Sequence, residues 1–217
     1  MKKILLFIIM VVFVQVVHAH SINYALEDAP AGEVVWFYLR LGFIHIVPGG
    51  LDHILFVAGL CLLSTEIKTI FWQATAFTVA HSITLGLSMK NIVIAPGNIV
   101  EPIIALSIVF VAIENMLLAQ LKPWRILLVF FFGLIHGLGF ASVLNEVGLP
   151  PGKFYTSLIA FNAGVELGQI AVISAIFTCI IFPLRNKIWY RRGIVIPVSA
   201  FIALVAFYWM IERVFFA

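Results

Sequence analysis

Histidine and acidic side chains recur inside, or at the ends of, the long apolar segments of this chain. They are Asp52, His53, His81, Glu101, His136 and Glu166, and His45 precedes them in a stretch broken by Pro48, Gly49 and Gly50. An ionisable group in hydrocarbon costs several kcal/mol unless it pairs with another group or holds a cation. Imidazole together with carboxylate suits Zn, Ni, Co, Fe or Cu. These residue types therefore predict an intramembrane site for a divalent transition-metal ion.

The composition defines the elements that must position these groups. Of 217 residues, 63% are hydrophobic and 11% are charged, and the mean hydropathy is +1.14. Such values are typical of a polytopic membrane protein. We therefore expect an all-α membrane helical bundle, with residues 20–217 forming one domain and the lipid bilayer as its surroundings. The net charge of +3 is small, and it gives no reason to expect a nucleic-acid partner.

The first 19 residues have the pattern of a secretory signal peptide. Lys2 and Lys3 precede the apolar residues 4–16, and Val17-His18-Ala19 offers a cleavage site. Cleavage there would make His20 the mature N-terminus, outside the cytoplasm. Its amine and imidazole would then be additional metal ligands. The alternative is an uncleaved anchor helix.

Apolar runs predict about six transmembrane helices, at 51–64, 69–89, 98–118, 124–144, 155–182 and 194–213. The segment 33–46 is shorter than the roughly 20 residues of a span, so it predicts an outer interfacial helix. Seven basic residues fall on the predicted cytoplasmic side, against four outside. The seven are Lys68, Lys122, Arg125, Arg185, Lys187, Arg191 and Arg192; the four are Arg40, Lys90, Lys153 and Arg213. This bias favours a bacterial-type inner membrane protein with its N-terminus outside.

Helix geometry predicts which polar groups can meet. At about 1.5 Å per residue, His81, His136 and Glu166 all lie near mid-membrane, and Asp52 and His53 begin the first span. Helical spacing also groups polar residues on shared faces, namely Thr78, His81 and Ser82 on one helix and Asn162, Glu166 and Gln169 on another. Lipid cannot satisfy such stripes, so they must face the bundle interior.

The remaining carboxylates are secondary candidates. Glu101 fits an outer entrance, whereas Glu114 with Asn115 fits an inner exit or a structural pairing with a loop arginine. Simpler roles exist for all these polar residues. A lone intramembrane histidine is often a hydrogen-bonded helix contact, Asp52 fits a helix cap, and hydroxyl and amide side chains often join helices.

Six ordered motifs resemble the HupE/UreJ family, in its branch with a signal peptide. They are HIVPGGLDHILF at 45–56, FTVAHS at 77–82, VEPIIALS at 100–107, IEN at 113–115, FGLIHGLGF at 132–140 and FNAGVELGQ at 161–169. The resemblance implies a nickel or cobalt permease associated with supply to hydrogenase and urease, and hence metalloenzyme maturation partners. It implies metal recognition by His45, Asp52 and His53, although six residues separate the first two here instead of the family's five.

The leading hypothesis is thus a permease for nickel, cobalt or zinc, with His45, Asp52, His53, His81, His136 and Glu166 as metal ligands. The alternative is a membrane-embedded, metal-dependent hydrolase acting on a lipid or lipidated substrate, with Ser82 and Glu166 as candidate catalytic residues. A metal sensor that holds an ion without moving it is a third possibility. The sequence predicts no oligomeric state.

Overall fold

The computed structural model describes residues 26–216, and no strand occurs among them. The expected signal peptide and His20 lie outside these residues. The helices are α2 (Ala31–Ile46), α3 (Leu51–Leu63), α4 (Ile67–Met89), α5 (Gly97–Leu117), α6 (Arg125–Val147), α7 (Phe154–Ile176), α8 (Phe182–Leu184) and α9 (Ile196–Phe215). A 3-10 turn (Pro151–Lys153) and two π-helical turns (Phe177–Ile181 and Arg191–Val195) complete the helical segments. The predicted all-α fold is confirmed.

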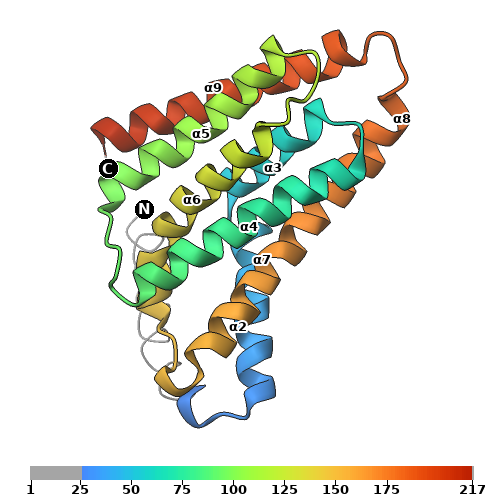
Figure 1. The fold of residues 1–217 in the computed structure, drawn as a ribbon. Helices are drawn as coiled ribbons and strands as arrows, with labels where there is room; N and C mark the ends of the chain where they lie inside the picture. The colour runs from blue at the N-terminus through green and yellow to red at the C-terminus, as the bar shows by residue number, and fades with distance from the viewer. Residues whose placement is uncertain (1–25, 217) are drawn as a thin grey trace, which may run out of the picture.

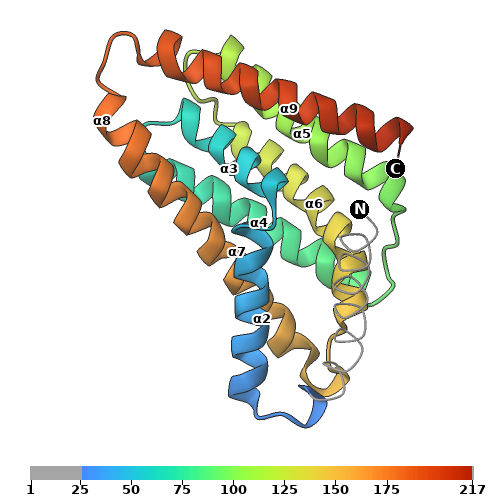
Figure 2. The same cartoon turned by 180° about the vertical axis from the view of Figure 1, so that it is seen from behind.

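Three helix pairs make the most extensive contacts: α4 with α6, α2 with α7, and α5 with α9. Figures 1 and 2 show α5 and α9 along one edge, α2 beside α7 at the other, and α3, α4 and α6 between them. Glycines allow two of these pairs to approach closely. A Cβ on Gly164 of α7 would strike the Leu39 backbone, and a Cβ on Gly137 of α6 would strike the His81 backbone. Small residues have this role in membrane helix packing.

Within residues 26–216, four helical segments are long and apolar enough to cross a membrane: Gly97–Leu117, Arg125–Val147, Pro151–Leu184 and Arg191–Phe215. A fifth crossing is possible if α2 and α3 act as one span, because they qualify only as a pair bent by 68°. Helix α4 is also 23 residues long. Its buried polar residues, among them Gln73, His81 and Ser88, lower its apolar character. The membrane class is therefore established, whereas the count of about six spans stays a prediction.

The segment at 33–46, expected to be an outer interfacial or partly inserted helix, packs along α7. Gly42 of α2 lies against Phe161, and Ile46 lies against Gly168, so α2 runs parallel to α7 along its side. Beyond the break, Tyr190 Oη donates to Leu62 O at the far end of α3. Helices α2 and α3 together therefore traverse the bundle. Broken helices at membrane depth commonly line ion sites, and this break places His45 opposite His53.

Candidate metal centre

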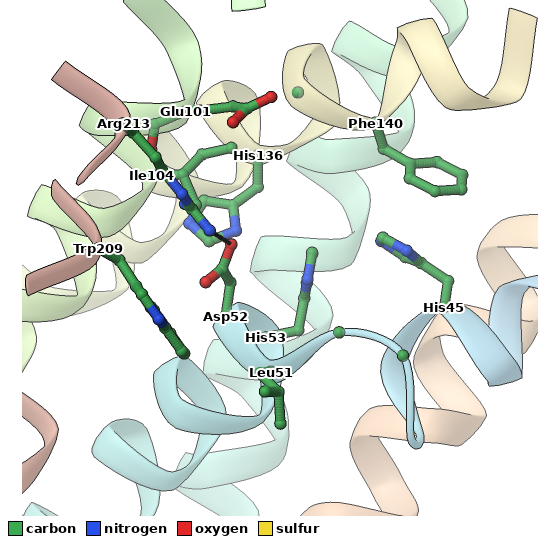
Figure 3. Close-up of a pocket in the computed structure, with 13 residues that line it drawn as sticks. His45, Leu51, Asp52, His53, Glu101, Ile104, His136, Phe140, Trp209 and Arg213 are labelled. Atoms are coloured by element: carbon green, nitrogen blue, oxygen red, sulfur yellow. Dashed lines mark hydrogen bonds and ion pairs between the residues drawn. The ribbon is translucent and has the colours of Figure 1, made fainter. Parts of the chain in front are cut away.

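Three histidines from different helices converge at the break between α2 and α3. His45 lies in the last turn of α2, His53 in the first turn of α3 and His81 in the middle of α4. One ring nitrogen of each lies within 4.8 Å of the others, so the three can hold a metal ion. His53 and His81 are buried and His45 is half-buried. Figure 3 shows His45 and His53 approaching each other from the two sides of the break.

His136 of α6 stands beside this group. Its ring centroid lies 5.1 Å from that of His53, and the side chain is buried. We call the four side chains His45, His53, His81 and His136 the histidine centre. The sequence predicted compatible depths for His53, His81 and His136 and placed His45 in the broken segment before the first span, and the structure brings the four together.

A hydrogen bond fixes the tautomer of His81. Its Nδ1 lies 3.2 Å from Asn162 Oδ1, and the amide nitrogen of Asn162 donates to Leu158 O at 2.8 Å. The amide therefore presents its oxygen to His81, so Nδ1 must donate its proton. Nε2 of His81 is left with its lone pair, the form that binds metals.

Ser107 has the same effect on His136. The hydroxyl lies 2.6 Å from Ile104 O and 3.0 Å from His136 Nε2. A hydroxyl has only one proton, and the carbonyl can only accept it. Nε2 of His136 is consequently the donor to Ser107 Oγ, which leaves Nδ1 with the lone pair.

Each histidine presents a buried ring nitrogen that has no hydrogen-bond partner among the described residues. These nitrogens are Nε2 of His45, His53 and His81, and Nδ1 of His136. A buried polar atom without a partner costs about 1–3 kcal/mol, which a bound cation would offset. Ligand nitrogens around a tetrahedral ion lie about 3.4 Å apart. The three clustered nitrogens would therefore need to move by roughly 1.5 Å or less.

Phenylalanine rings enclose the centre. Phe140 lies 3.8 Å from His45 between ring centroids, Phe77 lies 4.9 Å from His136, and Phe56 lies 5.2 Å from His136. Phe161 stacks on Phe140 at 5.0 Å. Such an apolar shell limits the access of water to a metal site.

A cavity of about 460 Å³ leads to the centre and is lined by His45, His53 and His136. Asp52, Glu101 and Arg213 also line it. Arg213 donates to Asp52 Oδ2 at 2.8 Å and to Glu101 O at 3.2 Å, and Figure 3 shows the first contact. Two carboxylates and one guanidinium give this lining a net negative charge, which attracts cations.

The other sequence candidates lie around the centre. The Asp52 carboxylate is paired with Arg213. Glu166 accepts a hydrogen bond from Thr75 at 2.7 Å, and Gln169 lies 3.1 Å from Thr78.

Ser82 donates to Thr78 O within its own helix. Neither Ser82 nor Glu166 is among the described residues that line the cavity, so the hydrolase hypothesis gains no support from their positions.

Glu114 forms the structural pair that was one of its two expected roles. Arg125 Nη1 lies 3.2 Å from Glu114 Oε2 and 2.9 Å from Asn115 Oδ1, and Arg125 is fully buried. Arg125 is the first residue of α6, within the span predicted at 124–144, and it is buried, whereas the other basic residues of the described part of the chain are at least partly exposed. Because its carboxylate is paired with a buried guanidinium, Glu114 is poorly suited to bind an ion that leaves the site.

Three features of the centre were missed by the sequence reasoning. Arg213 was counted only among the basic residues of the outer side, Ser107 belonged to a motif without an assigned role, and the phenylalanines had no predicted role at the site. Their roles depend on neighbours far apart in the chain. One local signal was available for Ser107: it follows Ile104 by three residues on the same helix, so its hydroxyl can donate to the Ile104 carbonyl.

The sequence model of one protein family, described as HupE / UreJ protein, matches residues 21–213. No curated protein matches the chain, and no solved structure does so either. The match covers the whole histidine centre and the helices that build it.

Proposed function

Because the chain belongs to the HupE/UreJ family, we propose that it is a membrane permease for a divalent transition-metal ion, with nickel or cobalt as the first candidates. The family implies a role in nickel or cobalt handling. The observation that carries the proposal is the convergence of three imidazoles, with that of His136 beside them, each of which has a buried ring nitrogen without a partner among the described residues. Imidazole suits Ni, Co and Zn better than Mg or Ca.

In the proposed cycle the ion enters the cavity from the side that carries Asp52, Glu101 and Arg213. The predicted orientation makes this the outer side. The carboxylates attract the hydrated ion, and the imidazoles then replace its water ligands. Asn162 and Ser107 keep two of these imidazoles in the tautomer that binds metal.

Metal binding and metal flux together test the proposal. Purified protein should bind one Ni²⁺ or Co²⁺ ion tightly, and proteoliposomes should take up the ion. His53→Ala combined with His81→Ala should abolish tight binding and uptake, while Asn145→Ala, an exposed change on α6, should alter neither. Unchanged metal stoichiometry in the double variant would refute the centre. Tight binding without uptake by the wild type would favour the sensor hypothesis.

A further inference from the structure

Polar side chains continue past the histidine centre along the contact between α4 and α7. These helices are antiparallel: Lys90 contacts Tyr155 at one end, His81 contacts Asn162 in the middle, and Thr75 contacts Glu166 further on. A second hydrogen bond between the two helices, from Thr78 to Gln169, lies next to that of Thr75 with Glu166. We call Thr75, Thr78, Glu166 and Gln169 the polar layer. Counting along α4, it lies about 5–9 Å beyond His81.

The polar layer contains two buried polar atoms that have no hydrogen-bond partner among the described residues, one oxygen and one nitrogen. Glu166 Oε2 is buried and has no partner among the described residues, and the same holds for the amide nitrogen Nε2 of Gln169, whose Oε1 accepts from the Thr78 hydroxyl. The Thr78 hydroxyl also contacts Ala74 O, at 3.2 Å. Its single proton can go only to one acceptor. When that acceptor is Ala74 O, Gln169 satisfies Thr78 by turning its amide NH₂ toward the hydroxyl, and the amide oxygen becomes the free atom.

We propose that the polar layer is a second, weaker binding position for the transported ion, reached after the histidine centre. The inference rests on the proposed function. Its ligands would be Glu166 Oε2 and the Gln169 amide oxygen, with the threonine hydroxyls in support. Transition metals prefer imidazole to such all-oxygen sites. A weaker position is what release requires, because conduction needs sites that an ion can leave.

The polar layer lies on the side of the histidine centre that faces the predicted cytoplasmic surface. Thr75 belongs both to the polar layer and to a surface hollow of about 370 Å³ that is also lined by Lys68 and Trp72. Lys68 marks the predicted cytoplasmic side. The Glu166 carboxylate is thus placed between the buried centre and this surface. Glu114, the other inner carboxylate, is held by Arg125 and offers no comparable step.

The test separates binding from passage. The probes are Ni²⁺ and Co²⁺, with equilibrium titration of purified protein and flux into proteoliposomes that contain a metal-sensitive dye. Glu166→Gln removes the charge without changing the size of the side chain. Its tight binding should stay within about twofold of wild type, while its flux should fall at least about tenfold. Thr75→Val, which removes only the hydroxyl contact, should lower flux less. Glu212→Gln, an exposed change on α9, should leave both unchanged.

Each outcome decides the inference. Wild-type flux from Glu166→Gln would overturn it. Joint loss of binding and flux in both Glu166→Gln and Thr75→Val would also overturn it, because the residues would then belong to the centre or to the fold. Circular dichroism and thermal melting of the variants identify the latter. Absence of flux in the wild type would instead refute the proposed permease function, and the polar layer would then have no role in transport.

Discussion

Replacement of Asn162 by leucine should weaken metal binding by acting through His81. The change removes the oxygen that accepts the Nδ1 proton of His81 while keeping a side chain of similar size. The imidazole is then free to carry its proton on Nε2, the ring nitrogen that has no partner among the described residues and would otherwise keep its lone pair for a metal ion. Loss of such a supporting contact typically costs 10–100-fold in metal affinity, or about 1.4–2.7 kcal/mol.

A double-mutant cycle makes this prediction specific. His81→Ala removes a ligand and should weaken binding more than Asn162→Leu. Because Asn162 acts only through the imidazole, adding Asn162→Leu to His81→Ala should change the affinity less than about twofold. Coupling of this kind is expected for residues in direct contact.

The assay is an equilibrium titration with Co²⁺, whose visible absorption reports the number and type of its ligands. Asn162→Leu should shift the spectrum as well as the affinity, whereas a purely structural defect would reduce only the fraction of competent protein. Asn145→Leu, an exposed position on α6, is the matched control. Equal loss of affinity in the His81 and His81→Ala backgrounds would refute the reasoning, because Asn162 would then act independently of the imidazole.

Two further predictions concern the cavity and the packing of α2. Arg213→Gln frees the Asp52 carboxylate and removes a positive charge, so it should tighten Co²⁺ binding by about 3–10-fold at low salt and less at high salt; weaker binding would contradict it. Gly164→Ala places a Cβ against the Leu39 backbone and should destabilise the protein by about 1–3 kcal/mol in thermal unfolding. Gly32→Ala adds a Cβ in open space and should not lower the melting temperature. Equal melting temperatures of the two variants would refute the close packing of α2 against α7.

Much of the fold could be predicted because it follows from apolar length. Helices such as α5 and α6 are long, predominantly apolar segments with few ionisable residues, and this apolar length predicts their approximate bounds. The pairing of α2 with α3 could not be predicted in this way. Neither helix alone is long enough for a span, and it is the tertiary contacts between α2 and α7, such as that of Gly42 with Phe161, that show α2 entering the bundle.

The histidines of the centre could be predicted because depth along a helix is set by residue count. His81 and His136 have equivalent depths whatever the details of packing. The partners of the carboxylates depend on tertiary neighbours and could not be found by counting. Asp52 meets Arg213, 161 residues away, and Glu166 meets Thr75, 91 residues away. Sequence patterns contain no direct signal for such contacts.

The distribution of charge explains why a permease needs both kinds of ligand. Four neutral imidazoles would bind a dication without neutralising its charge, so an ion in the histidine centre would keep its double charge in an apolar shell. Carboxylates on both sides of the centre compensate for this: Asp52 and Glu101 at the cavity, and Glu166 in the polar layer. Imidazoles select the metal by its preference for nitrogen, while the flanking oxygens lower the electrostatic cost of entering and leaving. A site for permanent storage would gain from carboxylates inside the centre itself, whereas their placement to either side favours transit.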